Sequence, residues 1–205
     1  MAASAGDVFV NCAFDSRFQP IFRAIVFAVL RSGFQPRCAL EVDDSSESRF
    51  IKIQNIVEQC PFGIHDLSRT ETDGEPPLPR FNMPLELGLF LGAKRFGNAT
   101  QRKKRALVLD TQPYRYQRFI SDLAGQDIHA HNGETSLAIE AVATWLRSQS
   151  RLPNIPGGRH IAAEFDSFQK ALPAALEERR LHPDELTFGD YRELALVYLE
   201  ISQGP

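Results

Sequence analysis

The sequence predicts an α/β protein built on a doubly wound parallel sheet. Segments typical of strands and of helices alternate strictly along residues 7–147. The chain has 205 residues, of which 43% are hydrophobic, and this suits one domain of about 150 residues with a remainder. Five strands with a helix between each pair imply helices on both faces of the sheet.

The first half of the pattern is clear. Residues 7–12, rich in Val and Phe, predict the first strand, and residues 20–31 have apolar side chains at helical spacing up to the stop at Gly33. Residues 36–41 predict a short second strand. A polar, serine-containing loop then leads to a helix over residues 47–59, where the serines are expected to cap it.

The next segments contain the most unusual stretch. Residues 62–66 predict the third strand, and residues 68–81 contain three closely spaced prolines that predict a surface loop without regular structure. A helix is expected over residues 83–95. Asn82 is placed to cap it, and Pro84 lies in its first turn, where a missing N–H is tolerated.

The remaining elements complete the sheet and add a tail. Two further strands are expected over residues 105–110 and 127–131, and two helices over residues 114–123 and 134–147. Proline and glycine between residues 148 and 159 indicate a linker, so residues 1–150 are predicted as the α/β domain and residues 151–205 as linker and helical C-terminal extension. The extension has helical patterns over residues 160–180, broken or kinked at Pro173, and 187–202. Their apolar faces must pack back on the domain or on another chain.

Composition excludes several classes of protein. The chain carries 23 basic and 26 acidic residues, a net charge of −3, which argues against nucleic acid or an anionic membrane as partner. No apolar stretch reaches the ~20 residues of a membrane span and no leader precedes the domain, so a cytoplasmic protein is expected. The cysteines Cys12, Cys38 and Cys60 are far apart, which predicts buried or semi-buried thiols, no disulfide framework and no metal site.

The winding of the sheet predicts where a ligand binds. We expect the flavodoxin-like strand order 2-1-3-4-5, in which the crevice lies beyond the carboxyl ends of the first and third strands. The loop over residues 11–17 and the segment that follows Asp66 meet there. This topology brings together seven candidate site residues, namely Asn11, Phe14, Asp15, Asp66, Ser68, Asn82 and Glu86.

Glu86 is the most distinctive of these candidates. It is the only charged residue between Met83 and Ala93, and a helix that is apolar on all sides is expected to be buried. A buried carboxylate without a partner costs several kcal/mol, so Glu86 either pairs with a basic residue such as Arg80 or faces a polar cavity. Its expected position in the first turn favours the anion. Gly88 and Gly92, one turn apart, predict close approach of a neighbouring segment.

Several catalytic signatures are absent. No GxGxxG follows the first strand, which argues against a dinucleotide-dependent dehydrogenase, and neither GxSxG nor HExxH occurs. The acidic pair Asp43 and Asp44 follows the second strand rather than the first, which disfavours a two-component receiver although Asp66 is suitably placed. His129 and His131 are expected on one face of the last strand, without a third ligand for a metal.

Two stretches carry a family resemblance. Residues 82–92, NMPLELGLFLG, resemble the N-x-x-x-E-L-G-x-x-x-G stretch of bacterial TIR-like nucleotide-binding effectors, and more distantly the E-x-G helix of nucleoside 2-deoxyribosyltransferases. Residues 7–10 followed by Asp15 resemble the opening strand and loop of TIR domains. The resemblance implies that Glu86 is catalytic and acts at the anomeric carbon of a nucleoside or of NAD. A carboxylate suits this chemistry, because breaking an N-glycosidic bond develops positive charge on the sugar.

The leading hypothesis is therefore an N-glycosidase or glycosyltransferase that acts on NAD or on a nucleoside or nucleotide. Asn11, Phe14, Asp15, Asp66, Ser68 and Asn82 are expected to bind this substrate, with NAD as a possible substrate and no separate cofactor. The resemblance implies a bacterial antiphage-defence effector that forms a homo-oligomer through its C-terminal helices or TIR-like surfaces. The alternative is a non-catalytic module that binds a nucleotide or another TIR-like domain.

Overall fold

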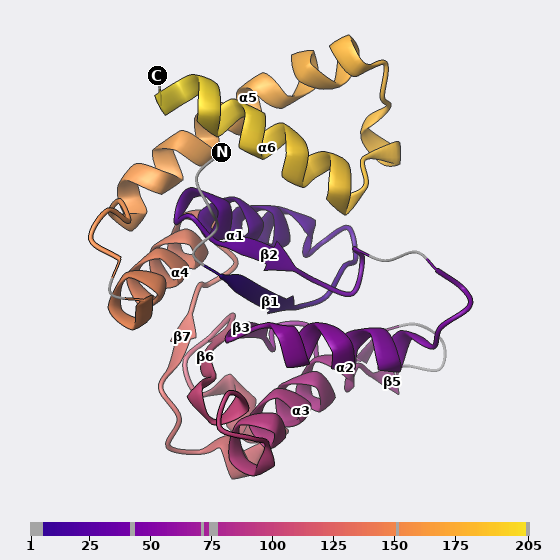
Figure 1. The fold of residues 1–205 in the computed structure, drawn as a ribbon, viewed down its shortest axis with the longest axis vertical. Helices are drawn as coiled ribbons and strands as arrows, with labels where there is room; N and C mark the ends of the chain where they lie inside the picture. The colour runs from indigo at the N-terminus through magenta and orange to yellow at the C-terminus, as the bar shows by residue number, and fades with distance from the viewer. Residues whose placement is uncertain (1–5, 42–43, 71, 74–77, 151, 204–205) are drawn as a thin grey trace.

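The computed structural model describes residues 6–41, 44–70, 72–73, 78–150 and 152–203. A five-stranded sheet lies at its centre, in the order β2-β1-β3-β6-β7, and all of its strands are parallel (Figure 1). The strands are β1 (Asp7–Asn11), β2 (Gln35–Arg37), β3 (Phe62–Asp66), β6 (Arg105–Asp110) and β7 (Ile128–Ala130). Counted along the chain, this is the order 2-1-3-4-5, so the predicted fold class is confirmed.

Helices cover both faces of the sheet. α1 (Gln19–Arg31) and α4 (Thr135–Ser150) lie on one face, and α2 (Arg49–Gln59) and α3 (Asn82–Phe96) lie on the other (Figure 1). The alternation of side chains along β1 follows from this arrangement, because Val8 and Val10 pack toward α1 and Phe9 packs with Ile53 and Phe90 toward α2 and α3.

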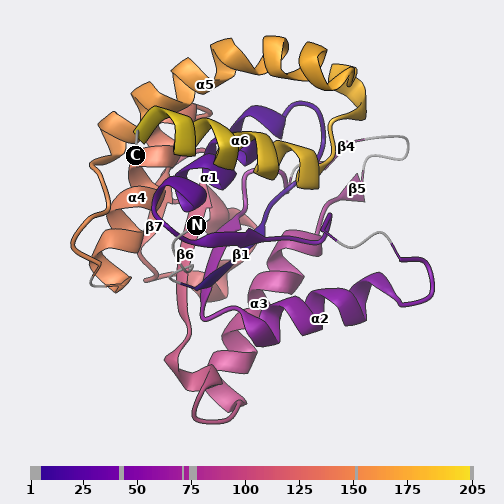
Figure 2. The same ribbon diagram turned by 45° about the horizontal axis from the view of Figure 1, so that its top comes forward.

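The C-terminal helices form an additional layer. α5 (Gly158–Arg179) and α6 (Phe188–Gln203) pack outside α1 and α4 (Figure 2). This layer explains why α1 is apolar on all sides between Ala24 and Leu30, since Ile25, Phe27 and Val29 are fully buried between the sheet and the extension. Of the two expectations for the tail, packing on the domain or on another chain, the structure shows packing on the domain. α5 continues through Pro173 without a break, where a break or a kink was expected. Within the described residues, no helix is long and apolar enough to cross a membrane.

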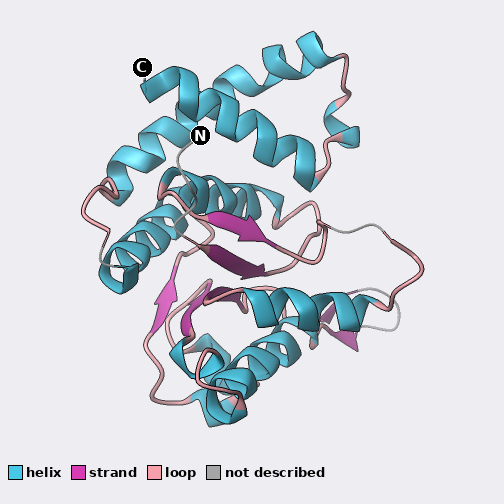
Figure 3. Cartoon of the chain, in the orientation of Figure 1, coloured by secondary structure: helices cyan, strands magenta, loops and turns pink. Residues whose placement is uncertain are grey.

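Two predicted segments differ in the structure (Figure 3). Residues 114–123 were expected as a helix but form two short 3₁₀ helices, Arg115–Arg118 and Ser121–Leu123. Tyr114 has a φ of 61°, a left-handed conformation that a continuous α-helix does not allow. The predicted loop over residues 68–81 contains a two-stranded antiparallel ribbon, β4 (Thr72–Asp73) and β5 (Leu78–Pro79), so the prediction of no regular structure there is wrong. Residues 71 and 74–77 of this loop lie outside the described part.

The expectation that α3 is fully buried is also wrong. Met83, Leu87 and Phe90 face the sheet and α2, but Leu85 is 58% exposed and Phe96 is 84% exposed. No outer layer of described helices covers this side of the sheet, in contrast to the side covered by α5 and α6. Nothing lies within 4 Å of a Cβ placed on Gly88 or Gly92, so these glycines do not mark a close approach.

Candidate functional site

The carboxyl ends of the central strands meet at one edge of the sheet. β1 pairs with both β2 and β3, and the chain reverses its winding direction between β1 and β3. Asn11, Asp66 and Asp110 are the last residues of β1, β3 and β6. This edge is therefore the position that the topology predicts for a ligand.

Three of the predicted acidic residues surround the end of β1. The pKa of the buried Cys12 thiol is raised well above its usual value, first by burial and then by neighbouring charges that include those of Asp66, Glu86 and Asp15. All three carboxylates consequently lie within electrostatic range of one atom. They face different surroundings, however, and the predicted site divides into four parts.

The first part is a cavity between α2 and α3 that contains Glu86. The cavity has a volume of about 200 Å³ and is lined by Arg49, Phe50, Ile53, Asn82, Leu85 and Glu86. Burial raises the pKa of Glu86 to about 7, an effect that the charge of Arg49 opposes only in part. Among the described residues, Glu86 has no hydrogen bond or ion pair. The carboxylate is thus half-buried beside a void rather than sealed against a guanidinium.

The helix that carries Glu86 begins differently from the prediction. Phe81 is the N-cap residue, and its side chain forms no capping hydrogen bond. Asn82 is the first residue of the helix and is exposed at the cavity. The predicted cap at Asn82 is therefore wrong. Glu86 lies in the second turn, where the end of the helix stabilises an anion less than it does in the first turn.

Asn11 connects this helix to the sheet. Its Nδ2 donates to the Met83 carbonyl of α3 at 2.8 Å and to Nδ1 of His65 at 3.0 Å, and its side chain is buried. His65 accepts through Nδ1, and burial lowers its pKa to about 3, so it is neutral at pH 7. Asn11 does not line the cavity. Instead, it fixes the first turn of α3 and thereby the position of Glu86.

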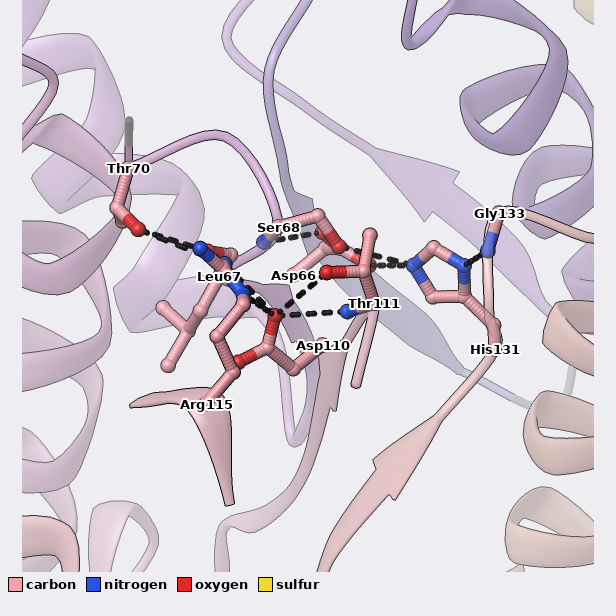
Figure 4. Close-up of polar contacts among 9 residues, drawn as sticks. All are labelled: Asp66, Leu67, Ser68, Thr70, Asp110, Thr111, Arg115, His131 and Gly133. Atoms are coloured by element: carbon pink, nitrogen blue, oxygen red, sulfur yellow. Dashed lines mark hydrogen bonds and ion pairs between the residues drawn. The ribbon is translucent and has the colours of Figure 1, made fainter. Parts of the chain in front are cut away.

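Asp66 and Ser68 belong to a second, buried part (Figure 4). Asp66 accepts a hydrogen bond from the Ser68 N–H at 2.8 Å, and its Oδ2 lies 3.0 Å from Nε2 of His131. The Ser68 hydroxyl oxygen lies 2.9 Å from the same nitrogen. These side chains are at most 3% exposed, so the structure does not place Asp66 or Ser68 in the cavity of Glu86.

The serine, histidine and aspartate do not form a nucleophilic triad. The Gly133 N–H donates to Nδ1 of His131 at 3.0 Å, so the ring proton resides on Nε2. Ser68 and Asp66 both contact that protonated nitrogen, whereas a triad requires them on opposite nitrogens, with an unprotonated one facing the serine. The arrangement ties the loop after β3 to the loop after β7.

A neighbouring network ties in the loop after β6. Arg115 donates to Oδ1 of the fully buried Asp110 at 2.7 Å and to the Leu67 carbonyl at 2.6 Å (Figure 4). Asp110 Oδ1 also accepts from the Thr111 N–H, whereas its Oδ2 is buried without a hydrogen-bond partner. Sequence reasoning missed His131, Asp110 and Arg115 as parts of this edge. The position of Asp110 at the carboxyl end of its strand was the signal available.

Asp15 forms the third part, at the loop after β1. It caps the approach to α1 by accepting from the backbone of Arg17 and Phe18, and it pairs with Arg69 at 3.1 Å and Arg80 at 3.2 Å. Burial raises the pKa of Asp15, but the hydrogen bond and charge of Arg69 lower it by more, so its pKa lies below the usual value. Arg80 thus pairs with Asp15, whereas the sequence had suggested it as a partner of Glu86.

Phe14 forms the fourth part and faces the C-terminal extension. Its ring packs edge to face on Phe22, with centroids 5.2 Å apart, and it lines a small cavity of about 60 Å³ together with residues 186–188 and Tyr191. The structure therefore does not bring Phe14 to Glu86. A cavity of about 410 Å³ between α5 and α6 contains none of the predicted site residues.

The described side chains include no group of three or more His, Cys, Asp or Glu residues that could hold a metal ion. His129 is exposed and His131 is buried, so the two histidines do not act as a pair.

No protein-family model matches the chain, and comparison with curated proteins and with solved structures found no match. The fold and the site define a doubly wound α/β protein with a half-buried carboxylate in a cavity between α2 and α3.

The raised pKa of Glu86 predicts a pH-dependent effect on stability. Between pH 4.5, its usual pKa, and about 7, the folded state holds the proton more tightly than the unfolded state, so wild-type stability falls as pH rises. Glu86→Gln removes this titration. From pH 5 to pH 8, we expect the free energy of unfolding of the variant to rise by about 1–3 kcal/mol relative to that of wild type. A pKa shift of one unit corresponds to about 1.4 kcal/mol. Urea unfolding at both pH values measures it, and an equal difference at pH 5 and 8 would contradict the burial of Glu86.

Proposed function

We propose that this protein cleaves the N-glycosidic bond of NAD or of another nucleotide or nucleoside, with Glu86 as the catalytic carboxylate. The observation that carries the proposal is the half-buried Glu86 carboxylate, which has no hydrogen bond or ion pair among the described residues and lines a cavity between α2 and α3. A structural carboxylate is usually paired, whereas a catalytic one needs space for a reacting group.

The chemistry suits a single acidic group. The bond between the anomeric carbon and the base nitrogen breaks, and its electron pair leaves with the base. The ionised Glu86 either stabilises the positive charge that develops on the sugar until water attacks the anomeric carbon, or captures that carbon as an ester that water then hydrolyses. In both routes water adds a hydroxyl group to the sugar and releases a proton. A base that departs as a neutral molecule from a cationic ring, such as nicotinamide, needs no general acid.

The surroundings of Glu86 provide for the rest of the substrate. Ile53 is buried at the cavity, and Asn82 offers an amide to sugar hydroxyls. A volume of about 200 Å³ is small for a whole nucleotide. Phe50 and Leu85 at its lip are 46% and 58% exposed, and these apolar surfaces suit the face of a base.

Self-association of the chain is part of the same proposal. α6 exposes Val197 and Ile201, which are 41% and 76% exposed, on the outer layer of the fold. These side chains support assembly of a homo-oligomer through the C-terminal helices. A role in bacterial antiphage defence rests on the resemblance of residues 82–92 to TIR-like effectors.

The proposal is tested by incubating the full chain with NAD, nucleosides and nucleotides and following the free base by chromatography. We expect base release, with kcat/KM rising through about pH 7 as Glu86 ionises in the free enzyme. A rate that falls over this range would assign Glu86 the role of an acid. Absence of release at every protein concentration would instead support the non-catalytic binding module, for which the exposed Phe50 and Leu85 offer a surface.

A further inference from the structure

The cavity of Glu86 has a cation opposite its carboxylate. Arg49, the first residue of α2, lines the same void from the facing helix, and its helix start is fixed by the Ser48 hydroxyl, which accepts from the Ile51 N–H at 3.3 Å. Among the residues that the structure describes, Arg49 has no hydrogen bond or ion pair. Its five N–H donors are therefore available to a ligand.

Arg49 is not explained as a partner of Glu86. Its charge acts on the carboxylate through space, yet the pKa of Glu86 still rises to about 7 because burial outweighs that charge. Arg69 and Arg80 do not line this cavity and are paired with Asp15 on the loop after β1. The cavity thus has an acid on one wall, a guanidinium on the other, and apolar side chains between them.

We infer that Arg49 binds a phosphate group of the substrate, so that the site accepts nucleotides in preference to nucleosides. This inference rests on the proposed function and selects among its substrates. A guanidinium matches the oxygens of a phosphate in a bidentate manner, and each charge-assisted hydrogen bond is stronger than a neutral one. A nucleoside offers no anion to Arg49.

The opposed charges give a second reason for this preference. A phosphate that enters the cavity comes close to the ionised Glu86, and the two anions repel each other. Arg49 lies on the same cavity and offsets this repulsion. Removing Arg49 is therefore expected to weaken nucleotide binding for two reasons, the lost hydrogen bonds and the repulsion by Glu86 that is no longer offset. Neither reason applies to the binding of a nucleoside.

The experiment compares two matched ligand pairs by calorimetry, AMP with adenosine and nicotinamide mononucleotide with nicotinamide riboside. We expect wild type to bind each nucleotide more tightly than its nucleoside. Arg49→Met is expected to weaken nucleotide binding by about 10- to 100-fold and nucleoside binding by less than about 3-fold. Arg49→Lys keeps the charge but not the bidentate fork, so it is expected to restore part of the affinity. The control is Arg95→Met, which changes an exposed arginine of α3 outside the cavity lining.

The same samples are assayed for base release, which separates the two proposals. Nucleotide binding that depends on Arg49 without release of any base would support the inference and refute the proposed function. Release from nucleosides and nucleotides with equal kcat/KM, unchanged in Arg49→Met, would support the function and overturn the inference. An equal loss of affinity for nucleotides and nucleosides in Arg49→Met would also overturn the inference, as would a wild-type protein that binds neither class.

Discussion

Glu86→Gln is expected to lower kcat for base release by about 10²- to 10⁴-fold at pH 8 while changing KM little. Glutamine has nearly the same shape as glutamate but carries no charge, so it fits the cavity. It cannot stabilise the positive charge on the sugar and cannot attack the anomeric carbon. The positive charge develops only in the transition state, so the loss falls on kcat rather than on binding. Single-turnover measurements with saturating substrate report this step directly.

Two further variants make the result specific to Glu86. Glu58→Gln removes a carboxylate from the exposed face of α2 and is expected to leave the rate within about 2-fold of wild type. Glu86→Asp keeps the charge but withdraws it by one methylene, so an intermediate rate is expected. A rate that survives Glu86→Gln would remove Glu86 from the mechanism and leave the enzyme with another catalytic group.

The order of the sheet was predictable because it depends on periodicity and connection length. Strand segments such as residues 62–66 are short, and the segment between each strand and the next is too long for a hairpin. Parallel crossovers have one favoured hand, which leaves few windings to consider. The structure confirms this order and the packing of the tail on the domain.

The exposure of α3 was not predictable from its sequence alone. The apolar run 83–93 matches a helix covered on all sides, but such covering depends on which other elements reach it. The C-terminal helices pack over α1 instead, and that choice of face is a tertiary property. Exposed Leu85 is consequently available to a ligand or a partner at the cavity.

The site was predictable as a neighbourhood and not as a set of contacts. Topology predicted that Asp15, Asp66 and Glu86 lie near the end of β1, and in the structure their charges add to the effect of burial in raising the pKa of the Cys12 thiol. It could not indicate that Asp66 is oriented toward His131 in the interior, because the partner comes from a segment 65 residues away. Arg49 was missed because it also belongs to a distant part of the chain. It lies on α2, which precedes β3, whereas Glu86 lies on α3, which follows β3.

Gly63→Ala is expected to destabilise the fold by about 3 kcal/mol, a large effect for one methyl group. A Cβ at this position in β3 lies 2.6 Å from Nε2 of His65 and 2.9 Å from two ring atoms of Phe90. Both side chains are completely buried and pack edge to face with centroids 5.0 Å apart, so neither has space to move away. Equilibrium urea unfolding measures the loss as a lower midpoint at unchanged slope.

The same substitution links the core to the helix that carries Glu86. Displacement of His65 weakens its hydrogen bond with Asn11, whose amide also holds the Met83 carbonyl three residues before Glu86. Base release is therefore expected to fall in Gly63→Ala even at temperatures where the variant is fully folded. Gly88→Ala is the matched control, because its Cβ meets open space on an exposed helical position, and it is expected to stabilise by about 0.5–1 kcal/mol. Equal stability of the two variants would show that His65 and Phe90 do not pack around Gly63 as described.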